Sequence, residues 1–208
     1  MHFQQAFAIL KLWGFEQSEK CFHLGYGFVS LPEGAMSARK GRVVLFKDVA
    51  DEALRRVTAT SKEKNPNLSD AVRADVAKAV GLGSLAYAML AVDNSRDTVF
   101  DMDVALSFEG RTGPYIQNAH VRAASILKKF EGLKVESLEA ATFNFELTSH
   151  EIELIELLSR FPAVVEQAAK EYRPMIMATY AYDLASAFHS FYHAVSVLKA
   201  ETDEIRDA

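Results

Sequence analysis

Three basic side chains, Arg39, Lys40 and Arg42, lie within four positions in the stretch EGAMSARKGRVV of residues 33–44. Two glycines accompany them, and the only acidic residue stands at the start of the stretch. With backbone amides as further donors, such a loop can hold nucleotide phosphates and stabilise the charge of a leaving pyrophosphate. A solvated hairpin turn between two strands is the alternative interpretation. The six residues MSARKG, taken alone, leave both interpretations open.

The rest of the sequence shows no second catalytic pattern. Cys21 is the only cysteine, so the chain can form neither an internal disulfide nor a cysteine zinc site. No serine or cysteine nucleophile arrangement is recognisable, and no metal-binding residues are predicted. A lone cysteine favours a reducing, cytoplasmic setting. Because no run of eighteen apolar residues occurs, no membrane partner is expected.

Residues 1–64 are predicted to form a small α/β unit around the basic stretch. Apolar residues at spacings of three and four predict a helix over residues 2–13, closed by a glycine. Strands are predicted at 21–30 and at 43–46, on either side of the loop. A helix follows from Asp48, with acids in its first turn and bases in its last turn.

The remaining chain is predicted to be helical. Ser69 suits the N-cap of a long helix, and Pro114 suits the first turn of another. Residues 131–146 have weak periodicity and are predicted to be a linker. The sequence T-S-H-E at 148–151 is typical of a capping box, and two prolines divide the chain beyond it into further helices. We therefore expect a mainly α fold, with at least four helices and no sheet longer than two strands over 69–208.

Charge is unevenly distributed along the chain, whose formal net charge is -5. Residues 1–64 hold ten Lys or Arg against seven Asp or Glu, residues 65–130 hold seven of each, and residues 131–208 hold six against fourteen. Since nucleic-acid binding usually needs a basic face, the acidic last third argues against sequence-indifferent binding there. A few aromatic contacts to unstacked bases remain compatible with it.

Three blocks of sequence resemble the class I arginyl-tRNA synthetases. HLGYGFVSLPEGAMSARKGRVVLFKDVADEA (23–53) resembles the signature-loop region of that family, whose pattern is LPEG-x-MSxRKG-xVV. VFDMDVALSFEGRTGPYIQNAHVR (99–122) resembles the junction that introduces the anticodon-binding domain, and YAYDLASAFHSFYH (180–193) resembles that domain's signature. The order of the blocks and their spread over nearly the whole chain make the match specific.

The resemblance implies the domain organisation and the fold class. It implies a small α/β remnant of the Rossmann-type class I catalytic domain over 1–64, a helical connecting region over 65–111, and an all-helical anticodon-binding bundle over 112–208. The family's HIGH motif and its N-terminal tRNA-binding domain have no counterpart in this sequence. We therefore expect an internal fragment, with an anticodon-binding domain that is incomplete at its C-terminal end.

The same resemblance assigns the basic stretch to catalysis. The matching catalytic residues are Met36, Ser37, Arg39 and Lys40. Ala35 and Ala38 occupy both lysine positions of the class I Lys-Met-Ser-Lys-Ser pattern. Arg39 and Lys40 are then expected to supply the positive charge from offset positions. The loop is expected to be mobile and to bind phosphate weakly in this chain.

Two further sets of residues are implied by the family match. The residues matched to the ATP pocket are His2, Gln5, His23, Gly27, Phe28 and Val29. The residues matched to tRNA binding are Arg111, Tyr115, Gln117, Arg122, Tyr182, His189 and Tyr192. Aromatic side chains of the second set suit stacking with unstacked anticodon bases. For each set, an ordinary role in packing or as a solvated surface is the alternative.

The family match implies that the parent enzyme activates arginine with ATP and Mg²⁺ and transfers it to tRNA-Arg. This piece is expected to bind no cofactor, to be inactive alone and to be a monomer. Two other classes of function are compatible with the residues. One is a free-standing RNA-binding helical module without catalysis, and the other is a helical interaction protein with no RNA role.

Overall fold

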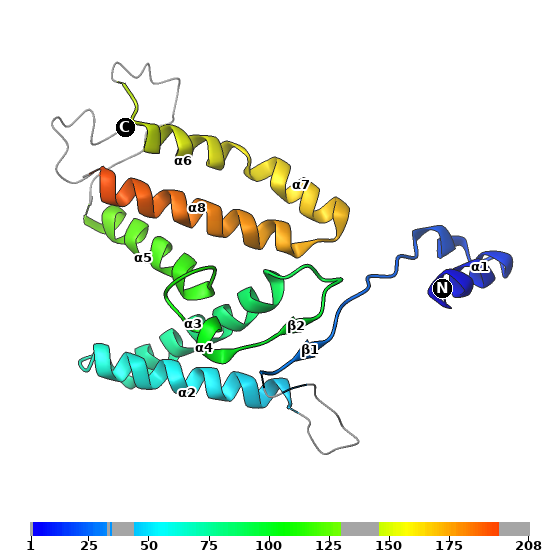
Figure 1. Cartoon of the computed structure of the whole chain (residues 1–208), viewed down its shortest axis with the longest axis horizontal. Helices are drawn as coiled ribbons and strands as arrows, with labels where there is room; N and C mark the ends of the chain where they lie inside the picture. Colours follow the sequence, from blue (N-terminus) through cyan, green and yellow to red (C-terminus); the bar gives the residue numbers. More distant parts are fainter. Residues whose placement is uncertain (1, 33, 35–43, 130–145, 196–208) are drawn as a thin grey trace.

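The computed structural model describes residues 2–32, 34, 44–129 and 146–195, and within them the fold is mainly helical (Figure 1). A two-stranded parallel sheet is the only sheet in this described part. The expected fold class is confirmed: a small α/β part leads into an all-helical part.

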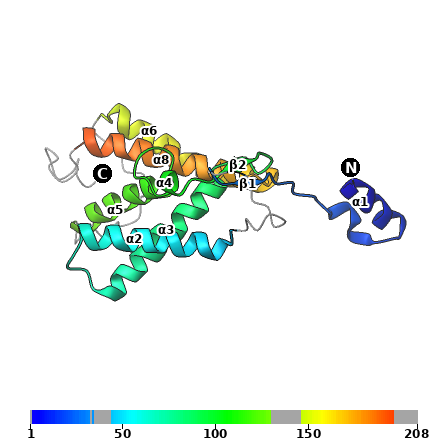
Figure 2. The ribbon, with the colours of Figure 1, turned by 60° about the horizontal axis from the view of Figure 1, so that its bottom comes forward.

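The N-terminal helix α1 (His2–Leu12) is followed by the short 3-10 helix η1 (Glu16–Lys20), which packs against it. Gly14, at φ +79°, turns the chain between them, and Lys11 Nζ lies 2.8 Å from Glu19 Oε1. The predicted first helix is thus confirmed. In Figures 1 and 2 this pair stands apart from the other helices, at the end of an extended segment.

The sheet joins two strands that are distant in the sequence. β1 (Val29–Ser30) pairs in parallel with β2 (Thr98–Val99), Val29 opposite Thr98 and Ser30 opposite Val99. A parallel pair needs a long crossover connection, and here the chain between the strands contains the helices α2 and α3. The predicted strand over 21–30 is therefore correct only at its last two residues.

The predicted strand over 43–46 is wrong where the structure describes it. Val44 and Leu45 are irregular, and Phe46 is the first residue of helix α2 (Phe46–Lys64). The Leu45 amide donates to Asp48 Oδ2 at 3.3 Å, so the Asp48 carboxylate satisfies a backbone donor at the helix start. This local cap begins the helix two residues earlier than predicted, and β2 takes the place next to β1.

Helices α2 and α3 (Asp70–Leu90) form an antiparallel pair. Ser69 caps α3 as predicted, because its hydroxyl accepts from the Val72 amide at 3.4 Å. Ala53 on α2 is 0% exposed and lies against α3 at Gly81. The hydrophobic core at this end of the pair also contains Leu85 and Phe100.

Helix α5 crosses α3 after the short helix α4 (Met102–Ala105). α5 spans Gly113–Lys129, with Pro114 in its first turn as predicted. The Thr112 hydroxyl donates to the Ser107 carbonyl at 2.6 Å and accepts from the Tyr115 amide at 3.3 Å. These two hydrogen bonds fix the start of α5 relative to the loop before it.

The last three helices are α6 (Ser149–Ser159), α7 (Phe161–Glu171) and α8 (Pro174–Ala194). The predicted capping box is present, because the Thr148 hydroxyl accepts from the Glu151 amide and the Thr148 amide donates to Glu151 Oε2. α8 lies between α5 on one side and α6 with α7 on the other (Figures 1 and 2). Tyr180 of α8 is 8% exposed and donates its hydroxyl to the Leu157 carbonyl at 3.0 Å.

The expectation for residues 69–208 is confirmed in the part that the structure describes. It contains more than four helices, and its only strand is β2. The predicted linker over 131–146 lies outside the described residues except for Glu146.

An ion pair ties the turn after α3 to the corner between α7 and α8. Arg173 Nη2 donates to Asp93 Oδ2, and the hydroxyl and amide of Ser95 donate to Asp93 Oδ1. The hydrogen bonds from Ser95, with that from Arg173, lower the pKa of Asp93 to about 2. The carboxylate therefore stays charged at neutral pH and holds these two segments together.

Candidate functional site

The basic stretch that sequence analysis assigns to catalysis lies outside the described residues. Met36, Ser37, Arg39 and Lys40 all fall within the undescribed range 35–43. The structure fixes both flanks of this range. On one side the Gly34 amide donates to the Leu31 carbonyl at 2.9 Å. On the other side Val44 leads into α2.

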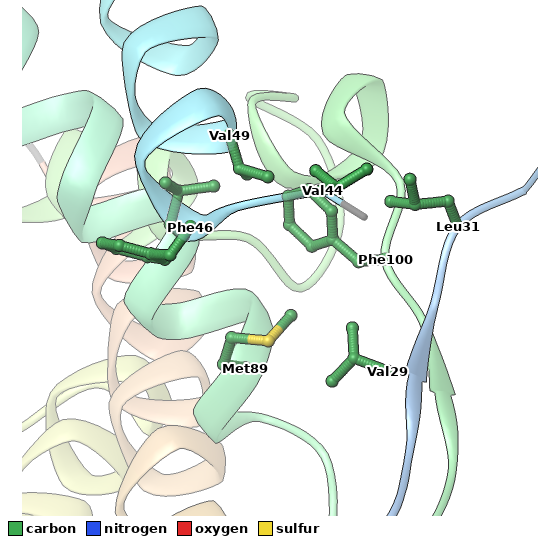
Figure 3. Close-up of a pocket in the computed structure, with 8 residues that line it drawn as sticks. Val29, Leu31, Val44, Phe46, Val49, Met89 and Phe100 are labelled. Carbon is green, nitrogen blue, oxygen red and sulfur yellow. The ribbon is translucent and has the colours of Figure 1, made fainter. Parts of the chain in front are cut away.

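An apolar pocket of about 190 Å³ lies beside these flanks. Figure 3 shows side chains from β1, from the start of α2, from the end of α3 and from the segment after β2 directed at a common space. Its lining consists of Val29, Leu31, Val44, Phe46, Val49, Leu85, Met89 and Phe100. Every lining side chain is a hydrocarbon or a thioether. The pocket therefore suits an apolar group and not a triphosphate.

A second hollow next to Leu31 is acidic. Its lining includes Asp48, Glu52, Asp101 and Asp103, with Arg56 as the one base. These carboxylates already have partners in the fold. The Asp48 carboxylate accepts a hydrogen bond from a backbone amide at the start of α2, and the Asp101 carboxylate accepts from backbone amides at the start of α4. Glu52 and Asp103 both form ion pairs with Arg56. The two hydrogen bonds from Arg55 and the bond from Arg56 lower the pKa of Glu52 to about 2.

The residues predicted for ATP binding divide into two groups. His2 and Gln5 are exposed on α1, and the His23 ring stacks on Phe3 of the same helix at 3.7 Å between centroids. Gly27 and Val29 lie instead beside the segment that leads into β2. In Figures 1 and 2, α1 stands apart from β1. The described residues therefore do not bring the two groups into one pocket.

Gly27 is a point of close approach, and the chain itself occupies it. The Gly27 amide donates to the Asn94 carbonyl at 2.8 Å, and a Cβ atom on Gly27 would lie 2.1 Å from the Arg96 carbonyl oxygen. Next to it, the Phe28 amide donates to Asp97 Oδ1 at 2.7 Å, while the Phe28 side chain is 84% exposed. The backbone here is held by the turn before β2, and the aromatic ring points away from it.

Most of the residues predicted for tRNA binding come together on α5 and α8. The Arg111 guanidinium, just before α5, lies 4.7 Å from the Tyr182 ring centroid and 3.4 Å from Asp183 Oδ1. The Tyr115 ring lies 5.3 Å from Tyr182 and meets His189 edge-on at 4.7 Å. Each contact joins a residue from the α5 segment to one from α8.

Arg122 continues this row about two turns after Tyr115 on α5. Its Nη1 lies 3.2 Å from His189 Nδ1 and 3.3 Å from His193 Nε2. Its guanidinium carbon lies 4.9 Å from the centroid of the Tyr192 ring. We call Arg111, Tyr115, Arg122, Tyr182, His189, Tyr192 and His193 the α5/α8 cluster.

Gln117 is the one predicted tRNA-binding residue that the structure places elsewhere. Its Nε2 donates to the Ala79 carbonyl of α3 at 3.0 Å. The same amide group lies in the space that a side chain on Gly83 would take. Gln117 therefore contributes to the crossing of α3 and α5. It lies on the side of α5 that faces α3 and not α8.

The structure also shows functional candidates that sequence analysis missed. A cleft of about 370 Å³ lies along the α5/α8 cluster, and its lining includes His193, Asn118, Ser186 and Ser190. Asn118 Oδ1 is buried and has no hydrogen-bond partner among the described residues. The spacing of four between His189 and His193, and between Asn118 and Arg122, places each pair on one helix face. That spacing was visible in the sequence, but only the helix contact shows that the two faces meet.

Burial lowers the pKa of His189, and the positive charge of Arg122 lowers it further. The hydrogen bond between His189 Nε2 and the Tyr115 carbonyl, at 3.4 Å, opposes this effect. His189 is therefore neutral at physiological pH. The cluster then presents two guanidinium cations, three tyrosine rings and the neutral imidazole of His189.

Guanidinium groups beside aromatic rings can bind single-stranded nucleic acid. The rings offer faces on which unpaired bases stack, and the cations attract the phosphates. Among the described residues, no group of three or more His, Cys, Asp or Glu side chains could hold a metal ion. In the same part of the chain, no helix is long and apolar enough to cross a membrane.

Two family models match the chain. The model described as "tRNA synthetases class I (R), catalytic domain" matches residues 1–102, and the "DALR anticodon binding domain" matches residues 116–208. The α5/α8 cluster lies in the second match, except for Arg111 and Tyr115, which directly precede it. The apolar and acidic hollows beside β1 lie in the first match, apart from Asp103.

Known proteins resemble the chain over nearly its whole length. It is 38% identical to an arginine–tRNA ligase from Halothermothrix orenii over all of this chain and 36% of that protein. It is 44% identical to an arginine–tRNA ligase from Pyrococcus abyssi over 96% of this chain and 32% of that protein. The solved Thermus thermophilus arginyl-tRNA synthetase is 35% identical, with a TM-score of 0.81 over 97% of this chain and 33% of that one. The chain thus spans about a third of the length of these relatives.

Proposed function

Because the chain belongs to the class I arginyl-tRNA synthetase family, we propose that it supplies tRNA binding and part of the ATP site to an arginine–tRNA ligase. Such an enzyme activates arginine with ATP and transfers it to the 3′ end of tRNA-Arg. The substrates are then arginine, ATP and tRNA-Arg, and the setting is the cytoplasm. We further propose that the protein acts as a monomer.

The observation that supports this proposal most directly is the α5/α8 cluster. Within one surface, Arg111 and Arg122 lie on the rings of Tyr182 and Tyr192. Tyr115 adds a third ring, next to that of Tyr182. Cations interleaved with aromatic rings are the pattern by which proteins bind single-stranded nucleic acid, with bases stacked on the rings and phosphates near the cations. The anticodon loop is the single-stranded RNA that the family match suggests.

We propose that residues 1–64 end the catalytic domain, that 65–111 connect it, and that 112–208 bind the anticodon. In this arrangement Met36, Ser37, Arg39 and Lys40 would face the ATP phosphates. Magnesium would enter with those phosphates, since it is usually held by one or two carboxylates together with substrate phosphates. Phe28 and Val29 would lie along the adenine side, since the turn before β2 already occupies the close approach at Gly27.

The RNA proposal predicts that the chain binds the anticodon stem-loop of tRNA-Arg, and that Tyr115→Ala weakens this binding about tenfold. Loss of one stacking ring costs about 1–3 kcal/mol of binding free energy. Fluorescence anisotropy with labelled RNA measures the dissociation constant. Tyr26→Ala is the matched control, because Tyr26 is an exposed tyrosine outside the cluster.

Two outcomes would contradict the RNA proposal. If the chain bound the stem-loop no better than a fully paired RNA duplex of equal charge, the cluster would not recognise unpaired bases. If Tyr115→Ala and Tyr26→Ala had the same effect, the interaction would not involve the α5/α8 surface. Either result would remove the α5/α8 cluster as the anticodon-binding surface, and no binding of either RNA would favour the helical interaction protein without an RNA role.

We also expect that the 208-residue chain alone does not catalyse arginine-dependent exchange between ATP and pyrophosphate. The described hollows beside β1 are apolar or acidic, and neither suits a polyphosphate. The assay measures incorporation of labelled pyrophosphate into ATP. Robust exchange would show that these residues form a complete nucleotide site. RNA binding without exchange is also what a free-standing RNA-binding module would show.

A further inference from the structure

We propose that RNA binding at the α5/α8 cluster is coupled to proton uptake by His189 and His193. The affinity for an RNA phosphate at Arg122 then rises as the pH falls. This inference rests on the proposed function and describes the regulation of the same site. Its basis is the way in which the two imidazoles hold the guanidinium.

The contacts of Arg122 define which ring nitrogens of the two histidines accept hydrogen bonds in the free protein. A guanidinium can only donate hydrogen bonds, so His189 Nδ1 and His193 Nε2 must both accept from Nη1. The other nitrogen of His189 lies 3.4 Å from the Tyr115 carbonyl and therefore donates to it. His189 is thus a neutral imidazole with its proton on Nε2, and it holds Arg122 on one side of the cleft.

Protonation reverses these contacts. A proton on His189 Nδ1 or His193 Nε2 would point at the Arg122 amino group, so the hydrogen bond would be replaced by repulsion between like charges. The guanidinium would be released into the cleft, where it and the protonated imidazole would then face the same space. An anion in that space relieves the repulsion. A bound phosphate therefore favours the protonated histidines, and protonated histidines favour a bound phosphate.

Within the described part of the chain, the surroundings of the cluster contain little negative charge that could replace the anion. α5 carries no carboxylate in its sequence and contributes Arg122, Tyr115 and the exposed His120. On α8 the only carboxylate is Asp183, which pairs with Arg111, and Tyr192 lies against Arg122. From α3, Tyr87 faces Arg111, Tyr182 and Asp183. Among the described residues of α6 and α7, no titratable side chain forms an ion pair or hydrogen bond with Arg122, His189 or His193.

The lowered pKa of His189 agrees with this geometry, since burial and the charge of Arg122 both disfavour its protonation while the site is empty. A phosphate adds a negative charge next to the ring, which raises the pKa. The cleft of about 370 Å³ beside these residues gives the anion room, and the Ser186 and Ser190 side chains line it as well. The phosphate therefore binds beside the ring that takes up the proton.

The test compares the pH dependence of RNA affinity in the chain with that in a double variant, His189→Gln with His193→Gln. Glutamine retains an oxygen that accepts from Arg122, but it does not titrate. The dissociation constant of the anticodon stem-loop is measured from pH 8 to pH 5.5 at constant ionic strength. One proton taken up changes the affinity by up to about tenfold per pH unit. We expect the chain to gain about tenfold or more across this range and the double variant to gain little.

His120→Gln is the matched control, because it removes an exposed histidine from α5 and should keep the full pH dependence. As a second readout, NMR titration of the His189 ring should give a higher pKa with RNA bound than without RNA. An equal pH dependence in the chain and the double variant, or an unchanged His189 titration, would overturn the inference and leave the RNA proposal intact. No RNA binding at any pH would overturn the RNA proposal and this inference with it.

Discussion

Gly113→Ala is expected to lower the free energy of unfolding by about 2–3 kcal/mol, because its methyl group would enter the backbone of α3. A Cβ atom on Gly113 would lie 2.8 Å from Ser84 Cα and 3.1 Å from the Gly83 carbonyl oxygen. Ser84 is fully buried, and so is Pro114, so neither helix can yield locally. Forcing one extra methyl group into such a contact typically costs about 1–3 kcal/mol.

Urea unfolding followed by circular dichroism measures this effect, and Gly81→Ala is the control. Gly81 also lies in a helix crossing, but a Cβ atom there would be 3.5 Å from the nearest Ala53 atom, an ordinary contact. Alanine is the better helix former by about 0.5–1 kcal/mol. Gly81→Ala should therefore leave the chain as stable as before or more stable. A Gly113→Ala chain as stable as this control would show that α5 can move away from α3 without cost.

The crossing at Gly113 also places the functional surface. Tyr115 follows in the first turn of α5, and its amide is held by the Thr112 hydroxyl. Gln117 anchors the next turn to the Ala79 carbonyl of α3. With α5 fixed in this way, the residues on its other side meet α8, so a shift of α5 should weaken RNA binding together with stability.

Local signals in the sequence predicted most of the helical part correctly. Ser69, Pro114 and the pair Thr148 and Glu151 each satisfy or remove backbone donors at a helix start through groups at most three residues away. Such contacts depend on neighbours in the sequence, and so they can be predicted without knowledge of the fold. The helix starts predicted from them agree with the structure.

Pairing between distant segments was not predictable in the same way. Val29 pairs with Thr98 across the whole α2/α3 connection, and no local pattern indicates that partner. The apolar residues around Val44 also suggested a strand, because the local pattern does not indicate their distant partners. The side chains of Val44 and Phe46 instead line a pocket with Met89 and Phe100 (Figure 3), which is a role that apolar composition alone cannot distinguish from a strand.

The candidate RNA surface was predicted in part. Sequence analysis identified Tyr182, His189 and Tyr192 on one helix and Arg122 on another, as amphipathic residues in blocks that match the family. It missed His193 and Asn118, because their importance depends on the face that α5 turns toward α8. The roles of Met36, Ser37, Arg39 and Lys40 stay predictions, since these residues lie outside the described part of the chain.

A buried arginine gives the second large effect that we expect. Arg73 lies in the first turns of α3 and is only 6% exposed. Its Nη2 donates to the Leu68 carbonyl at 2.7 Å and its Nη1 to the Asn65 carbonyl at 3.4 Å. Pro66 offers a third carbonyl at 3.5 Å. One guanidinium thus donates to three backbone carbonyls of the turn between α2 and α3.

Arg73→Met should therefore lower the free energy of unfolding by about 2–4 kcal/mol. Methionine keeps much of the apolar stem but removes the guanidinium that donates to the Leu68, Asn65 and Pro66 carbonyls, and hydrogen bonds to charged groups contribute about 1.5–3 kcal/mol each. Arg55→Met is the matched control on α2, because its side chain is 68% exposed and pairs with Glu52 at the surface. Exposed pairs of this kind contribute little, so the control should unfold at nearly the same urea concentration as the unchanged chain.

The comparison also decides what the turn between α2 and α3 contributes. In the sequence, Arg73 resembles any solvated base on a helix, and only its burial gives it a structural role. If Arg73→Met unfolded at the same urea concentration as Arg55→Met, the carbonyls of the turn would find water or other donors at no cost. A large difference would mean that this one guanidinium holds the α2/α3 pair closed, and with it the crossover that brings β2 to β1.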